Sequence, residues 1–157
     1  VADVRQHGAT AILVLPVQRL GFGPDGKIRN SHQGYDEAVR KMGAALNVPV
    51  IDLTTLTAQM YEALGPQNAP LAFANHGQEK THHAAYGAFM IACIVTQHLV
   101  AMPELGVKAA ADTPACCGPA ASATCPIAAA ARPDVATMPQ KRLPSFARRP
   151  PPNAAEP

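Results

Sequence analysis

The sequence predicts an α/β fold built on a parallel sheet. Two continuous apolar runs rich in Val, Ile and Leu, residues 11–17 and 48–53, have the pattern of strands that are covered on both faces. Between them, a segment rich in Gly, Asn and charge (residues 21–34) indicates a loop, and the spacing of apolar residues from Tyr35 to Leu46 indicates an amphipathic helix of about three turns. A strand, a helix and a second strand in this order form a right-handed crossover.

Two more helices are expected after the second strand. Thr54 and Thr55 can cap the first of them, which ends at Gly65-Pro66. The second spans roughly residues 84–102, with its apolar side formed by Tyr86, Phe89, Met90, Cys93, Ile94 and Leu99. Two strands alone leave an unpaired edge and uncovered apolar faces, so we expect half of the sheet to lie outside this sequence, which begins with Val.

Charge and hydropathy argue against two classes of partner. The 157 residues include 13 Lys and Arg against 11 Asp and Glu, a balance that disfavours nucleic-acid binding. The longest apolar runs fall short of the roughly 20 residues that a membrane span requires. We therefore expect neither a nucleic-acid nor a membrane partner.

The chain changes in composition near Gly106. Eleven of its 16 prolines lie at or after Pro103, and six basic residues face three acidic ones beyond Leu105. We expect residues 1–105 to form the folded part and residues 106–157 to be an Ala/Pro-rich, mostly disordered tail. Cys93 lies in an apolar helix and is expected in the core, whereas the spacing of Cys116, Cys117 and Cys125 fits neither paired zinc ligands nor a dense disulfide framework.

Titratable side chains are densest directly before the last expected helix, at His76, Glu79, His82 and His83. A carboxylate three residues ahead of an imidazole can fold back and accept a hydrogen bond from Nδ1, which leaves Nε2 free to act as a base. Solvated or capping side chains are the simpler interpretation of the same pattern. A metal site formed by His76, Glu79 and His82 or His83 is a third possibility, but the spacing disfavours it because helical ligand pairs usually stand at i and i+4.

The run from Glu79 to Ala88, EKTHHAAYGA, resembles the last conserved block of the SGNH/GDSL hydrolases, in their rhamnogalacturonan acetylesterase-like branch. That block has an Asp-x-Thr-His ahead of a helix that opens with a Gly-Ala pair. Residues 8–19 resemble the fourth strand of that branch and its following loop, and residues 35–40 and 47–53 resemble its next helix and strand. The resemblance covers most of residues 1–105.

The resemblance implies the C-terminal portion of a flavodoxin-like, three-layer α/β/α domain, with His82 as the catalytic base and Glu79 in the place of the orienting Asp. Members of this family also carry a Gly-Asp-Ser nucleophile block and Gly and Asn blocks for the oxyanion hole, and none of these occurs here. The serines present, Ser31, Ser122 and Ser145, do not follow the pattern of an activated nucleophile. We therefore expect a serine esterase fragment that is inactive alone and needs no cofactor or metal.

The remaining candidates have structural interpretations. We expect His83 to be exposed at the helix start, Arg19 to be exposed, Asp52 to cap a helix, and Ser31 and His76 to lie in loops.

By resemblance, the partners are an acetylated polysaccharide or oligosaccharide and the missing N-terminal half of the domain, and the protein is extracellular or periplasmic. The alternative functions are a noncatalytic remnant or binding module and, less favoured, a His/Glu metal-binding module.

Overall fold

A computed structural model describes residues 1–108 and combines helices with a small parallel sheet, which is compatible with an α/β fold. The expected disorder of the tail and the positions of Cys116, Cys117 and Cys125 lie outside these residues. Among residues 1–108, no helix has the length and apolarity needed to cross a bilayer. The elements in chain order are α1 (Ala2–Gln6), β1 (Leu13–Val14), α2 (Tyr35–Leu46), β2 (Val50–Ile51), α3 (Leu53–Asn68), η1 (Ala69–Ala72), η2 (Ala74–Gly77), α4 (Ala85–Val100) and η3 (Pro103–Leu105).

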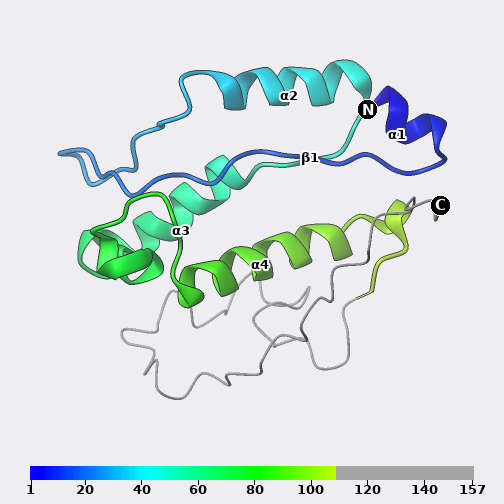
Figure 1. The fold of residues 1–157 in the computed structure, drawn as a ribbon. Coiled ribbons are helices and arrows are strands. Elements are labelled where there is room, and N and C mark those ends of the chain that lie inside the picture. Colours follow the sequence, from blue (N-terminus) through cyan, green and yellow to red (C-terminus); the bar gives the residue numbers. More distant parts are fainter. Residues whose placement is uncertain (109–157) are drawn as a thin grey trace, which may run out of the picture.

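The two strands pair in parallel between helical layers. Leu13 stands opposite Val50 and Val14 opposite Ile51 in the ladder. Helix α2 lies on one side of this pair, whereas α3 and α4 lie on the other (Figure 1). The strands are much shorter than the apolar runs that predicted them. The prediction that both faces are covered is wrong for β1 within residues 1–108, since Val14 is 50% exposed there.

The main core lies between α3, η1 and α4, and its buried members are Met60, Tyr61, Ala69, Ala72, Phe73, Tyr86 and Met90. The Tyr61 and Phe73 rings pack with their centroids 5.0 Å apart. Helix α3 breaks at Gly65, whose φ of 73° only glycine adopts readily, so the chain turns there and brings η1 back over the core. This confirms the expected end of the helix at Gly65-Pro66.

Helix α2 begins and ends as predicted but does not bury its apolar side. Its buried residues are Asp36 and Gly43, whereas Tyr35 is 75% exposed and Met42 is 52% exposed. Gly43 allows the close approach to the sheet, because a Cβ at this position would stand 2.3 Å from a methyl group of Val50. No described residue covers the opposite, apolar side of the helix.

Candidate functional site: the Glu79–His82 loop

Backbone hydrogen bonds join the two ends of the loop that carries the candidate base. The Ala74 amide donates to the His82 carbonyl at 2.9 Å, and the Ala84 amide donates to the Ala72 carbonyl at 3.0 Å. The loop is also fixed to the segment after β1, because the Leu20 amide donates to the Lys80 carbonyl at 2.9 Å. These contacts hold residues 79–82 beside Leu20, in the segment that follows β1 on the carboxyl side of the strand.

Within this loop, the Glu79 carboxylate folds back onto the imidazole of His82. Its Oε2 lies 3.2 Å from His82 Nδ1, and its Oε1 accepts a hydrogen bond from the Thr81 amide at 2.7 Å. The Thr81 amide and then the His82 contact lower the pKa of Glu79. Both carboxylate oxygens of Glu79 therefore have a partner, and these contacts favour the ionised form.

His82 Nε2 remains available for proton transfer. The side chain is 79% exposed, and its only contact within residues 1–108 that fixes the ring is the one to Glu79. A carboxylate on Nδ1 selects the tautomer in which Nε2 lacks a proton, and this is the form that a general base requires. The contact that the spacing of Glu79 and His82 predicts is present, and the catalytic role of the pair stays a prediction.

His83 lies on the opposite side of the backbone from His82, and the expectation that it is exposed is wrong. Its Nε2 lies 2.6 Å from the Tyr61 hydroxyl, and its ring centroid lies 4.7 Å from that of Phe73. Burial and then the neighbouring charge of His82 lower the pKa of His83. In extended backbone, successive side chains point to opposite sides, and residue 83 forms a bridge with Phe73, so His83 turns into the core when His82 turns out.

The remaining candidates make no contact with the side chains of Glu79 or His82. His76 is exposed in η2 with a left-handed φ of 53°, and Ser31 lies in the turn before α2 with its hydroxyl 3.5 Å from Gln18 Oε1. Asp52 caps α3 by accepting from the Thr55 amide at 3.0 Å, as expected. Within residues 1–108, no three His, Cys, Asp or Glu side chains are grouped closely enough to hold a metal ion.

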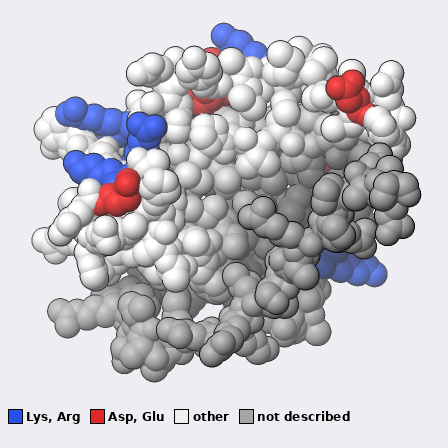
Figure 2. All heavy atoms as spheres, viewed as in Figure 1, with Lys and Arg blue, Asp and Glu red and all other residues white. Residues whose placement is uncertain are grey.

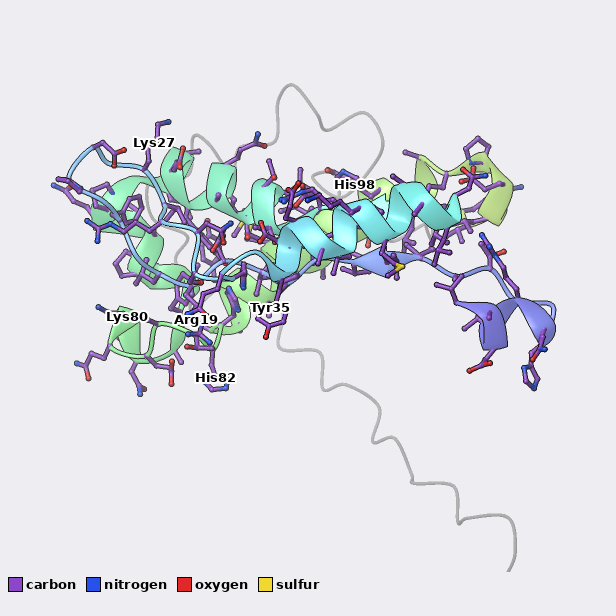
Figure 3. All side chains as sticks on the ribbon, turned by 90° about the horizontal axis from the view of Figure 1, so that it is seen from above. Arg19, Lys27, Tyr35, Lys80, His82 and His98 are labelled. Carbon is purple, nitrogen blue, oxygen red and sulfur yellow. The ribbon has the colours of Figure 1, made fainter. Side chains whose placement is uncertain are left out.

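Two basic side chains are exposed at the loop, one within it and one in the segment bonded to it. Arg19 and Lys80 are exposed and lie on the same side of the molecule as His82 (Figure 3). Lys and Arg side chains also gather at this end of the face in Figure 2, with an acidic side chain among them. The exposure expected for Arg19 is confirmed.

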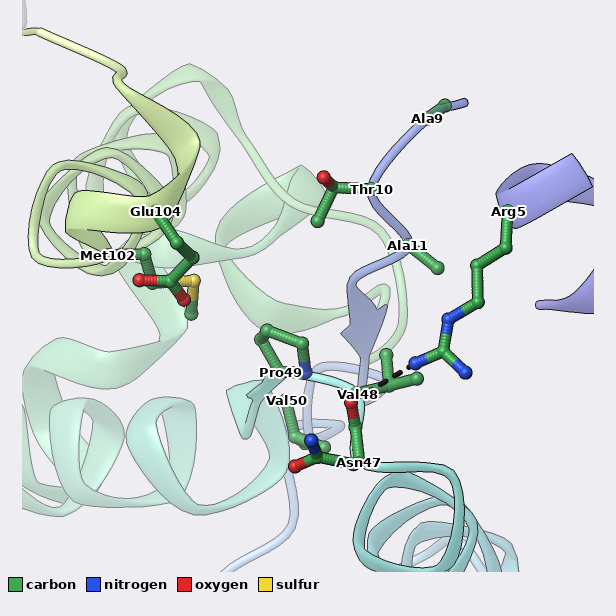
Figure 4. A pocket seen from close by; sticks show the side chains of 10 residues that line it. All are labelled: Arg5, Ala9, Thr10, Ala11, Asn47, Val48, Pro49, Val50, Met102 and Glu104. Carbon is green, nitrogen blue, oxygen red and sulfur yellow. Dashed lines mark hydrogen bonds between the residues drawn. The ribbon is translucent and has the colours of Figure 1, made fainter. Parts of the chain in front are cut away.

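Two pockets lie at opposite ends of the strands. A pocket of about 530 Å³ is lined by residues of the loop after β1 and of the N-terminal halves of α2 and α3, among them Gln18, Asp36 and Arg40. A pocket of about 680 Å³ lies at the amino ends of the strands, where Arg5 donates to the carbonyls of Leu46 and Asn47 (Figure 4). No residue of the Glu79–His82 loop lines either pocket.

An ion-pair network that the sequence did not predict borders the first pocket. Arg40 donates to Asp36 Oδ2 at 3.0 Å and to Asp52 Oδ2 at 2.9 Å, so it links α2 to the cap of α3. Burial alone would raise the pKa of Asp36, but hydrogen bonds from Asn30 and Arg40 hold it below its ordinary value. The one signal in the sequence was the i,i+4 spacing of Asp36 and Arg40, which usually indicates an exposed pair.

Comparison with known proteins gives a match to one characterised enzyme. The chain is 32% identical over 114 residues to the rhamnogalacturonan acetylesterase RhgT of Bacillus subtilis (strain 168). This match supports a distant relationship to that enzyme. It covers 66% of this chain and 48% of the relative, so the chain spans about half the length of the enzyme it matches. No family model and no solved structure matches the chain.

Proposed function

We propose that this chain carries the general base of a carbohydrate O-acetylesterase and is completed by a polypeptide segment that supplies the serine nucleophile. The observation that carries the proposal is the Glu79–His82 pair, in which a carboxylate contacts Nδ1 and Nε2 is free. The distant relationship to a rhamnogalacturonan acetylesterase supplies the reaction class. The substrate proposed is accordingly an acetylated polysaccharide or oligosaccharide.

In the proposed reaction, His82 moves one proton in each half of the cycle. Nε2 removes the proton from a serine hydroxyl as its oxygen attacks the acetyl carbonyl, and returns that proton to the sugar oxygen as the ester bond breaks. Water then attacks the acetyl-serine with its proton passing to Nε2, and acetate leaves as the serine recovers that proton. Glu79 keeps the ring in the required tautomer and stabilises the imidazolium in both steps.

The uncovered apolar surface supports a completing segment. Tyr35, Met42 and Leu46 are exposed on α2, and Val14 is exposed on β1, which within residues 1–108 pairs with β2 alone. A segment that adds a strand beside β1 and covers α2 would remove this surface from water, and burial of apolar area is the dominant favourable contribution to such association. We propose that this face receives the half of the domain that carries the nucleophile.

The 157-residue chain alone is accordingly expected to be inactive. Ser31, the only serine within residues 1–108, has its hydroxyl near Gln18 and far along the chain from His82. A base without its nucleophile retains almost none of the rate enhancement of a triad, because the members act as a unit.

The test compares the 157-residue chain with the polypeptide that the native source produces. Each is treated with a fluorophosphonate probe, which labels activated serines, and each is assayed for acetate release from an acetylated pectic oligosaccharide. We expect labelling and acetate release from a native product longer than this chain, and neither from the chain itself. A native product of 157 residues that folds and releases no acetate would contradict the esterase proposal and leave a binding role.

A further inference from the structure

His83 connects the Glu79–His82 loop to the core of the protein. Residues 80–82 are exposed. The side chain that follows them contacts two buried members of the core, since its Nε2 lies 2.6 Å from the Tyr61 hydroxyl and its ring centroid lies 4.7 Å from that of Phe73. The chain is therefore fixed by a side chain at residue 83, directly after three residues whose side chains are in solvent.

The two core partners of His83 are themselves held in place. Tyr61 is 0% exposed and Phe73 is 1% exposed, and their ring centroids lie 5.0 Å apart. The His83 ring stacks on Tyr61 with an interplanar angle of 23° and a centroid distance of 6.2 Å. Because side chains in a close-packed interior occupy defined rotamers, α3 and the segment between η1 and η2 together set the position of the His83 ring.

The contact between His83 and Tyr61 joins two uncharged groups. Burial raises the pKa of the Tyr61 hydroxyl, and burial, followed by the charge of His82, lowers the pKa of His83. Near neutral pH, one group can therefore donate a hydrogen bond to the other, and this directional bond fixes the plane of the His83 ring. An uncharged His83 also does not oppose the positive charge that His82 takes up in the proposed reaction.

Backbone hydrogen bonds carry the position of residue 83 to its neighbour. The His82 carbonyl accepts from the Ala74 amide at 2.9 Å, and the Ala84 amide donates to the Ala72 carbonyl at 3.0 Å, so the two bonds flank His83. In extended backbone, a side chain directed into the core requires its neighbour to point away from it. The His82 side chain is 79% exposed, so its direction depends on this backbone and on its contact with the carboxylate of the loop.

We propose that His83 is a positioning residue for His82, and that its contact with Tyr61 in the core sets the direction in which the loop holds the His82 imidazole against Glu79. This inference rests on the proposed function for the role of His82 as the base. His83 acts through the backbone alone, so its loss should disturb the orientation of the base and leave the binding of substrate intact.

The experiment measures the tautomer of the His82 ring by long-range ¹H–¹⁵N NMR, in the full 157-residue chain and at a pH at which the ring is neutral. The contact with Glu79 favours the proton on Nδ1, whereas an unrestrained imidazole in water favours Nε2. We expect His83→Ala to shift the tautomer ratio about fivefold toward the Nε2 form, which corresponds to the loss of one net hydrogen bond. Lys80→Ala, which alters an exposed side chain of the same loop, should leave the ratio unchanged.

Two results of this measurement would overturn the proposal. One is an unchanged tautomer ratio in folded His83→Ala, and the other is a parent chain in which His82 shows no preference for the Nδ1 form. If His83→Ala fails to fold, Tyr61→Phe keeps the ring packing, removes only the hydroxyl, and should shift the ratio in the same direction by about twofold. An unchanged ratio in folded Tyr61→Phe would contradict the proposal equally.

Turnover by the native polypeptide provides the second measurement. There, His83→Ala should lower kcat about tenfold and change KM by less than about twofold, because a misplaced base slows proton transfer without removing a substrate contact. A raised KM with an unchanged kcat would show a role in substrate binding and would overturn the proposal. Because the tautomer measurement involves no turnover, a native polypeptide that releases no acetate while the tautomer shift is observed would refute the esterase proposal alone.

Discussion

Gly87, in the first turn of α4, is the position at which one added methyl group should disturb the candidate site most. An ideal Cβ at residue 87 would stand 2.1 Å from the carbonyl oxygen of Ala72 and 2.9 Å from its carbonyl carbon. Both contacts are with backbone, which cannot rotate aside. The same carbonyl accepts a hydrogen bond from the Ala84 amide, and this bond helps to join the two ends of the Glu79–His82 loop. Gly87→Ala must therefore push α4 away from η1 and disturb the loop between them.

The size of the effect follows from two opposing contributions. Replacing Gly with Ala inside a helix favours folding by about 1 kcal/mol. Overpacking a well-packed site typically costs about 1–3 kcal/mol, and a contact with backbone at this distance lies at the upper end of that range. We therefore expect Gly87→Ala to lower the free energy of unfolding by about 1–2 kcal/mol.

The assay is urea unfolding of the full chain followed by far-UV circular dichroism, together with a ¹⁵N spectrum of the folded state. The control is Gly21→Ala, because a Cβ at that position meets no atom within 4 Å, and its free energy of unfolding should stay within about 0.5 kcal/mol of the parent. A Gly87→Ala variant as stable as the parent, with unshifted signals from residues 79–83, would refute the close packing of α4 on η1.

Three further predictions concern the buried polar contacts. Tyr61→Phe removes the hydroxyl that lies 2.6 Å from His83 Nε2 and should lower the free energy of unfolding by about 1 kcal/mol. Tyr35→Phe, on the exposed face of α2, should leave the free energy of unfolding unchanged. Equal effects of the two variants in urea unfolding would contradict the contact. Because folding lowers the pKa of His83, the unfolded chain binds more protons near that pKa, so stability should fall as the pH drops below about 6.5, and this part of the fall should vanish in His83→Phe. Arg40→Met leaves the buried Asp36 carboxylate without its cation and should lower the midpoint of thermal unfolding clearly. Lys41→Met loses only an exposed pair with Glu37 at 3.7 Å and should leave the midpoint unchanged. A larger decrease for Lys41→Met than for Arg40→Met would show that the α2–α3 network does not stabilise the fold.

Local signals in the sequence were sufficient for α2, α3 and α4 and for the contact between Glu79 and His82, whereas α1 was not predicted. The bounds of α2 follow from its apolar spacing, and the break in α3 follows from Gly65-Pro66. The contact between Glu79 and His82 could be predicted because both residues lie in one short loop and their spacing sets the reach. The catalytic role of this pair stays a prediction.

The features that the sequence did not predict depend on contacts between distant segments. His83 turns inward because Phe73 pairs with it and Tyr61 reaches its ring, and neither partner is near it in sequence. The apolar side of α2 stays uncovered because Gly43 brings the other side of the helix against the sheet. Burial of Asp36 likewise depends on the loop that brings Asn30 over it.

The most direct test of the central claim, that His82 is the general base oriented by Glu79, is acetate release by the native polypeptide carrying single substitutions. His82→Ala should abolish turnover and Glu79→Gln should reduce it strongly, whereas His76→Ala, which alters an exposed loop histidine nearby, should leave it close to that of the parent. If His82→Ala released acetate at the parental rate, His82 would not be the base and the proposed function would be wrong.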